Sequence, residues 1–136
     1  MSLKDILKEN PNLTVEGFQR FQEEYDRRFV AEKFTGLKKV IHTYAHVGKL
    51  LGRLAGYVEI VEEGNHHPSP DEIREKVIPD LLVYSVWLAS EFKVNVEEAY
   101  LKRIVDNIQR LHSDKIAPEE LKELEDYVNE RFQKTD

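Results

Sequence analysis

The sequence predicts an all-α protein, a helical bundle of four to five helices joined by short loops. Apolar residues recur at intervals of three and four in successive segments, which is the spacing of one face of an α-helix. Residues that favour helix N-termini, such as Thr14, Ser69 and Asn95, stand directly before these segments. No segment shows the alternation of apolar and polar residues that is typical of a half-buried strand.

The first half of the chain contains two predicted helices. Residues 1–13 are expected to form an N-terminal arm, and an amphipathic helix of about four turns then begins after Thr14. A long second helix is predicted from a cap at Thr35 to Gly64. It runs through a series of apolar positions: Leu37, Val40, Ile41, Tyr44, Val47, Leu51, Leu54, Val58 and Val61.

The third predicted helix begins at Ser69, which precedes a proline and a glutamate in a capping-box arrangement. Its second half, LLVYSVWLA, is apolar on all sides and is expected to be covered on every side, in the core or at a subunit interface. Pro79 lies inside this helix and is expected to kink it.

The last two predicted helices complete the bundle. Asn95 and Glu98 form another capping-box pattern before a helix that ends near residue 112. A C-terminal helix, starting near Pro118, is expected within residues 113–136. The whole chain, 1–136, is therefore expected to be one domain with its core helices in 14–112.

Three glycines, Gly48, Gly52 and Gly56, lie four residues apart in the second helix. Each costs roughly 0.5–1 kcal/mol relative to alanine in a helix interior. We expect this cost to be offset by a second helix that packs closely against the small residues. The alternative is that the glycines leave space for a ligand.

Composition excludes several classes of function. The chain has no cysteine, so it has neither disulfides nor thiolate chemistry. Its net charge of -6 argues against nucleic-acid binding. The N-terminus is unlike a signal peptide and the longest apolar run is too short to cross a bilayer, so a soluble cytoplasmic protein without a membrane partner is expected.

The stretch from 75 to 110 resembles the MazG-like superfamily of all-α nucleoside triphosphate pyrophosphohydrolases, and the resemblance covers roughly residues 14–112. In that family an aspartate precedes an apolar run that ends Leu-Ala. A helix reading Glu-Glu-Ala follows, with a basic residue, an asparagine and an arginine at fixed later spacing. The matching positions are Asp80, Leu88, Ala89, Glu97, Glu98, Ala99, Arg103, Asn107 and Arg110. The resemblance implies hydrolysis between the α and β phosphates, with Arg103, Asn107 and Arg110 near phosphate or base.

The upstream half departs from the family where that family holds its metal. The family pattern Glu-Glu-x-Gly-Glu-Leu falls on residues 45–50, where Gly48 and a leucine are kept but His46 and Lys49 stand in place of glutamates. A third family glutamate corresponds to Val77, so Asp80 is the one carboxylate left of the four. A magnesium ion needs several hard oxygen ligands, and one aspartate does not provide them.

Three interpretations of this altered site stay open. In the first, the Lys49 ammonium replaces the metal and pairs with Asp80, so no cofactor is expected. In the second, His42 and His46, four residues apart, join Asp80 as ligands for manganese, nickel or zinc. In the third, carboxylates from elsewhere in the chain or from a partner subunit complete a site for Mg²⁺ or Mn²⁺.

The leading hypothesis is a degenerate MazG-like protein that binds a nucleotide or a protein partner without magnesium-dependent hydrolysis. One alternative is an active pyrophosphohydrolase that converts a nucleoside triphosphate to the monophosphate and pyrophosphate. Another is a structural interaction protein with no ligand. A homodimer or homotetramer is expected, because one helix is apolar all round and one carries a glycine stripe.

Overall fold

The computed structural model describes residues 7–8, 14–30, 34–63 and 69–133. The predicted arm over 1–13, apart from Leu7 and Lys8, lies outside the described residues. The described residues form helices and loops and contain no strand, so the all-α prediction is confirmed. The chain folds into two compact units, residues 1–93 and 94–136. That residues 1–136 act as one domain stays a prediction.

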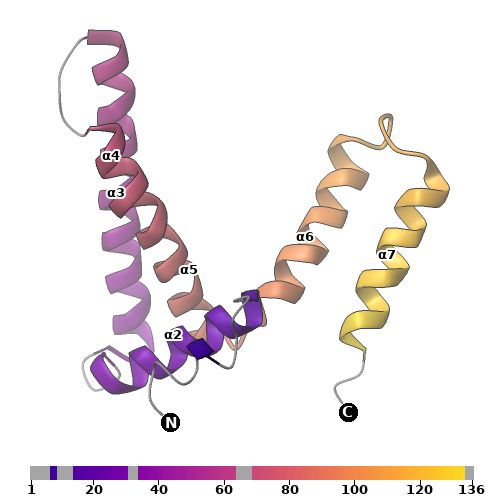
Figure 1. Cartoon of the computed structure of the whole chain (residues 1–136), viewed down its shortest axis with the longest axis horizontal. Coiled ribbons are helices and arrows are strands. Elements are labelled where there is room, and N and C mark those ends of the chain that lie inside the picture. Colours follow the sequence, from indigo (N-terminus) through magenta and orange to yellow (C-terminus); the bar gives the residue numbers. More distant parts are fainter. Residues whose placement is uncertain (1–6, 9–13, 31–33, 64–68, 134–136) are drawn as a thin grey trace. The chain divides into compact units, whose positions relative to one another are not determined.

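The first unit is built from three helical segments (Figure 1). They are α2 (Val15–Phe29), α3 (Leu37–Glu63) and a continuous run of α4 (Pro70–Glu72), η1 (Ile73–Val77) and α5 (Ile78–Glu91). Helix α3 lies beside the η1 and α5 run, and α2 packs against α5. The second unit is a helical hairpin of α6 (Val96–Leu111) and α7 (Pro118–Phe132).

The predicted start signals form the expected caps in three helices. Thr14 Oγ1 accepts a hydrogen bond from the Gly17 N–H at 3.0 Å, and Asn95 Oδ1 accepts one from the Glu98 N–H at 3.0 Å. Ser69 Oγ likewise accepts from the Glu72 N–H at 3.3 Å. Each cap satisfies an N–H that the first helical turn leaves without a partner.

The predicted cap at Thr35 is wrong. The Gly36 carbonyl accepts the first helical hydrogen bonds of α3, from the N–H groups of Lys39 and Val40. Gly36 has a φ of 56°, a left-handed conformation that costs glycine little and other residues more. The chain therefore enters α3 through a glycine turn.

Pro79 coincides with an irregular turn in the third helical segment. Residues Ile73–Val77 form a π-helical turn, in which the Ile78 N–H bonds to the Ile73 carbonyl. Proline has no N–H for the carbonyl four residues earlier, and its ring crowds that carbonyl. Widening the preceding turn relieves this conflict, so Pro79 marks a local departure from the α-helix.

Each unit has a small buried core. In the first unit the buried apolar side chains are Leu50 on α3 and Val77, Val86, Trp87 and Ala89 on the η1 and α5 run. In the second unit Val105 and Val128 pack between α6 and α7, and Arg131 forms an ion pair with Glu97 at 2.6 Å. The cores lie where one helix faces another.

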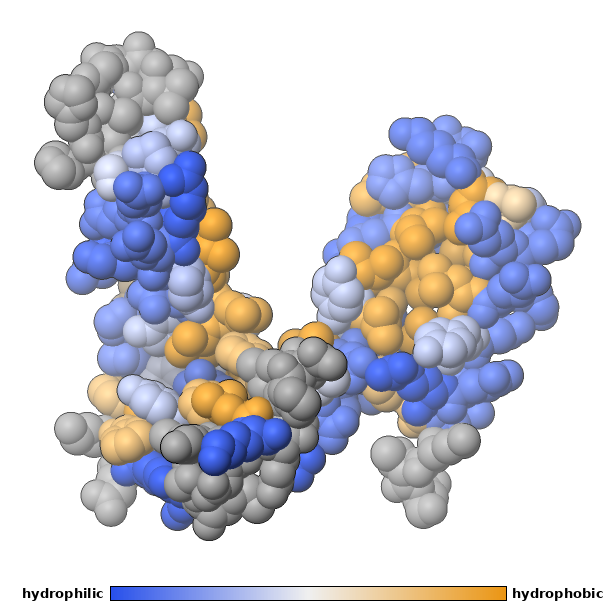
Figure 2. Space-filling model, viewed as in Figure 1, coloured by the Kyte–Doolittle hydropathy of each residue, from blue (hydrophilic) through white to orange (hydrophobic). Residues whose placement is uncertain are grey.

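The prediction that LLVYSVWLA is covered on every side is wrong for the isolated chain, and apolar residues of α2 and α3 are exposed as well. Leu82 in α5 is 53% exposed, so LLVYSVWLA is not covered on every side. Phe29 in α2 is 60% exposed, and the open face of α3 includes Ile41 and Tyr44. Hydrophobic residues reach the surface of both units in Figure 2. The physical reason is that three helical segments in one unit and two in the other do not surround any one helix.

Candidate functional site

The expected pairing of Lys49 with Asp80 is wrong for the described chain. Both side chains are exposed, and no ion pair joins them within the described residues. Lys49 directly precedes the buried Leu50 in α3, and adjacent residues on a helix point about 100° apart. The face of α3 that packs on α5 therefore leaves Lys49 outside.

The proposed metal ligands do not form a metal site in the part of the chain that the structure describes. The ring centroids of His42 and His46 lie 4.2 Å apart, as their spacing predicted. No group of three or more His, Asp or Glu side chains is arranged to hold a metal ion within 7–8, 14–30, 34–63 and 69–133. His42, His46 and Asp80 therefore do not form the predicted ligand set.

The phosphate-binding candidates lie on α6 in the second unit. Arg103 Nη1 donates to Asp106 Oδ2 at 3.1 Å, and Arg110 Nη2 donates to Asn107 Oδ1 at 3.1 Å. These pairs, three residues apart, are ordinary neighbours on a helix surface. Nothing in their geometry tests the role that the resemblance implies.

Gly48 and Gly52 do not pack against another helix within the described part of the chain, and packing of the glycines against a helix of a second copy stays a prediction. A Cβ added to either of these two glycines meets no described atom within 4 Å. Both glycines are exposed on the side of α3 that faces away from α5. Gly48 and Gly52 are therefore part of an open surface.

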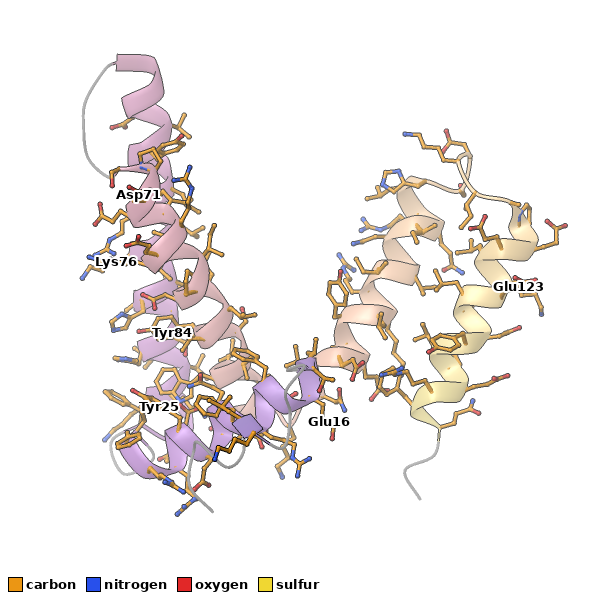
Figure 3. All side chains as sticks on the ribbon, in the orientation of Figure 1. Glu16, Tyr25, Asp71, Lys76, Tyr84 and Glu123 are labelled. Carbon is orange, nitrogen blue, oxygen red and sulfur yellow. The ribbon has the colours of Figure 1, made fainter. Side chains whose placement is uncertain are left out.

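Residues of α2, α3 and α5, together with Val30 directly after α2, line a pocket of about 210 Å³. Three aromatic residues line it: Tyr25 on α2 with Tyr84 and Trp87 on α5. Figure 3 labels the two tyrosines, which come from these two different helices. The other described lining residues are Gln22, Asp26, Val30, His42, Asp80 and Val83. Among the described lining residues there are two carboxylates and neither lysine nor arginine.

Asp26 is the most unusual group in this pocket. It is 8% exposed, and its Oδ1 accepts a hydrogen bond from Gln22 Nε2 at 2.8 Å. Its other oxygen, Oδ2, is buried and has no hydrogen-bond partner among the residues that the structure describes. Burial raises the pKa of the Asp26 carboxyl, although the bond from Gln22 and the charge of Lys39 oppose that rise. Buried carboxylate oxygens without partners are rare in proteins and costly.

Lys39 on α3 is the positive charge that acts on Asp26, although it is not among the pocket-lining residues. Its side chain is 8% exposed, and its Nζ donates to Ser90 Oγ at 2.6 Å. The same Nζ lies 5.3 Å from the centroid of the Trp87 ring, which is the geometry of a cation–π contact. Lys39 and Asp26 are thus both buried, but no ion pair joins them within the described chain.

A cluster of rings joins the pocket to the α3 and α5 interface. His42 stacks on Phe34 at 4.1 Å between ring centroids, and its edge meets Trp87 at 5.2 Å. His46 stacks on Tyr84 at 5.1 Å with 18° between the ring planes. His42 and His46 therefore serve here as aromatic packing partners.

We expect His42 to titrate below its ordinary pKa of 6.5, because burial disfavours the charged imidazole and His46 lies beside it. A lowered folded pKa means that the stabilising contribution of neutral His42 is complete above the ordinary value. That contribution is lost as the pH falls through the folded pKa. An NMR titration of the imidazole measures this midpoint directly.

The variant His46→Asn provides the control, because it removes the neighbouring titratable ring. The midpoint of His42 should then move back toward its ordinary value without reaching it, since the burial persists. A midpoint at or above 6.5 in the unmodified protein would contradict this account of the ring cluster.

The key residues of the pocket, Asp26 and Gln22, were missed by sequence reasoning. Phe18, Phe21, Tyr25 and Phe29 mark the apolar stripe of the amphipathic helix α2. The structure instead buries Gln22 and Asp26, which lie four residues apart on another face. Their spacing, which permits a side-chain hydrogen bond on a helix, was the available signal.

Comparisons of the chain with protein-family models, with curated proteins and with solved structures found no significant match. The resemblance to the MazG-like superfamily thus stays a prediction from its residues. Within the described residues, no helix is both long and apolar enough to cross a membrane. What the structure shows is an all-α protein with an aromatic and acidic pocket in its first unit.

Proposed function

We propose that this protein is a small-molecule binding module, a degenerate MazG-like protein that does not hydrolyse its ligand. The pocket beside Asp26 is its binding site. The observation that carries this proposal is that Asp26 lines a pocket together with three aromatic residues, and that its buried Oδ2 has no hydrogen-bond partner within the described residues. A ligand that donates a hydrogen bond to this oxygen would remove the cost of leaving it unsatisfied.

The pocket lining favours a ligand that carries a positively charged or N–H-bearing nitrogen on a small alkyl group or a flat ring. Asp26 and Asp80 place negative charge in the lining, and the faces of Tyr25, Tyr84 and Trp87 attract cations and flat rings. Two kinds of molecule carry such a group: alkylammonium ions and nucleobases with exocyclic amines. In both, N–H donors or positive charge face the carboxylate while the rest of the ligand lies on the rings.

The same lining disfavours the phosphates of a nucleotide. Phosphate groups are bound by arginine, lysine, a metal ion or helix N-terminal N–H groups. The described lining offers two carboxylates instead. We therefore expect a nucleotide to bind through its base, and no more tightly than the corresponding nucleoside.

The test uses the single tryptophan of the chain, Trp87, as a fluorescent reporter in the pocket. Trimethylammonium, adenine, adenosine and ATP are titrated separately, and isothermal calorimetry confirms each affinity. We expect binding of trimethylammonium or adenine, weakened roughly tenfold or more in Asp26→Asn, since the anchoring charge is lost. Glu123→Gln on α7 is the matched control, because it removes the same charge from an exposed site outside the pocket.

The two probes distinguish the ligand sources. Trimethylammonium binding alone identifies an organic-cation site, and adenine binding alone identifies a base site. Binding of neither probe, or equal binding by Asp26→Asn and the unmodified protein, would overturn the assignment of the pocket. Release of pyrophosphate from ATP with Mg²⁺ or Mn²⁺ would overturn the proposal that the protein is not a hydrolase.

A further inference from the structure

The outward face of α3 carries a heptad repeat of exposed apolar residues. Leu37, Tyr44, Leu51 and Val58 lie seven residues apart, and Ile41, Gly48 and Ala55 lie between them at alternate spacings of four and three. The exposed fractions of the five large residues range from 55% at Val58 to 81% at Tyr44. These are the a and d positions of a coiled-coil seam, with Ile41, Gly48 and Ala55 at a and the other four residues at d.

This seam is a different face of α3 from the one that packs inside the chain. The residues of α3 that are buried are Lys39, Thr43 and Leu50, on the side toward α5. On the outward side the chain offers no cover to the two central glycines, since an added Cβ would meet no atom within 4 Å. A regular apolar stripe of about 30 Å along one helix is thus left in water.

We propose that this seam, residues 37–58 of α3, pairs in antiparallel orientation with the same seam of a second copy of the chain. In an antiparallel two-helix coiled coil each layer combines an a residue of one helix with a d residue of the other. The layers are then Ile41 with Val58, Tyr44 with Ala55, and Leu51 with Gly48. Large residues lie beside small ones in two of these layers, so the packing volume is even along the seam.

A parallel pair would fit worse. Each of its layers contains two copies of the same residue, so Tyr44 would meet Tyr44 and Gly48 would meet Gly48. Bulky layers would alternate with layers that leave a void, and voids between packed helices are destabilising. The order of residue sizes in the sequence therefore favours the antiparallel pair.

The charges beside the seam point to the same partner and the same orientation. The flanking e positions are Lys38, Ala45, Gly52 and Glu59, all of them exposed. Antiparallel pairing places e positions opposite each other, so Lys38 of each copy faces Glu59 of the other. Ala45 faces Gly52, and these small residues permit close approach of the helices. Neither Lys38 nor Glu59 forms an ion pair within the described part of its own chain.

A second copy loses less conformational entropy on binding to the seam than an unfolded peptide does. The helix is already formed in each chain, so association orders only side chains and does not have to fold the seam. The interface is isologous, because the same residues contribute from both sides of a two-fold axis. The seam is also distinct from the ligand pocket, because the described pocket lining shares no residue with the seam.

Sedimentation of the full chain tests the seam. The unmodified protein should be a dimer at micromolar concentration, and Gly48→Glu should weaken the dimer roughly tenfold or more, because its charge must be desolvated in the seam. The added side chain meets open space in the single chain, so the variant should keep its helical circular dichroism spectrum. Lys49→Glu is the matched control, since it adds a glutamate one position away and outside the seam.

Two further variants test the orientation. Lys38→Glu should weaken the dimer by placing like charges together, and Lys38→Glu combined with Glu59→Lys should restore it. The chain has no cysteine, so Lys38→Cys combined with Glu59→Cys should form a covalent dimer on oxidation, whereas each single variant should not.

A monomeric unmodified protein, or a Gly48→Glu variant that associates as tightly as the unmodified protein, would overturn the seam. A failure of the double charge reversal to restore association would overturn the antiparallel pairing.

Discussion

The variant Trp87→Ala is expected to lower the free energy of unfolding of the first unit by about 3–5 kcal/mol, the range for removal of a buried large aromatic side chain. Trp87 is 4% exposed, and its ring meets Phe34, His42 and Tyr84 within the cluster between α3 and α5. The substitution removes these contacts and also leaves the buried Lys39 without its cation–π partner. Urea denaturation followed by circular dichroism measures the loss.

Trp87→Phe is the matched control for this experiment. A phenylalanine keeps a ring at the centre of the cluster, so we expect a clearly smaller loss than for alanine. The second unit provides an internal reference, because its core residues Val105 and Val128 are separate from Trp87. A loss below about 1 kcal/mol for Trp87→Ala would show that this cluster is not the core of the first unit.

The variant Asp26→Asn is expected to raise the free energy of unfolding at pH 7 by roughly 1–3 kcal/mol, because the neutral amide avoids the desolvation of a buried carboxylate charge. The amide keeps an oxygen to accept the bond from Gln22, and it carries no charge to be desolvated. An increase in stability together with a loss of ligand binding is typical of a functional residue, since binding sites are often retained at a cost in stability.

The sign of the pH dependence makes this prediction specific. Burial raises the pKa of Asp26 above its ordinary value of 3.8. The stability associated with the protonated carboxyl is therefore complete below pH 3.8 and is lost as the pH rises through the folded pKa. The advantage of Asp26→Asn should thus be largest at neutral pH and should shrink on acidification. Thermal unfolding at pH 7 and pH 4 compares the two proteins, and an advantage that grows toward low pH would contradict the raised pKa.

The helices and their beginnings were predictable from the sequence because these features are local. A cap such as Thr14 or Asn95 acts on an N–H three residues away, so a short stretch of sequence contains both partners. Thr35 shows the limit of this reasoning, because Gly36 beside it adopts the left-handed conformation and begins the helix. Propensity alone does not distinguish two neighbouring residues that both favour helix N-termini.

The candidate site was much less predictable. The pairing of Lys49 with Asp80 assumed that one particular face of α3 turns toward α5, and the structure buries a different face. The pocket depends on Tyr25 and Asp26 in one helix and Tyr84 and Trp87 in another, about sixty residues apart in the chain. Their meeting follows from helix packing, which hydrophobic periodicity does not specify when a helix carries two apolar faces.

The sequence by itself determined that this chain is helical and that Thr14, Ser69 and Asn95 cap three of its helices, since these properties come from backbone conformation and residue spacing. Only the tertiary structure decided which face of each helix is buried. It placed Asp26 inside with a bare oxygen, and it left Gly48 and Gly52 facing open space. The physical reason is that burial is a property of pairs of helices: a face becomes interior only when another helix covers it.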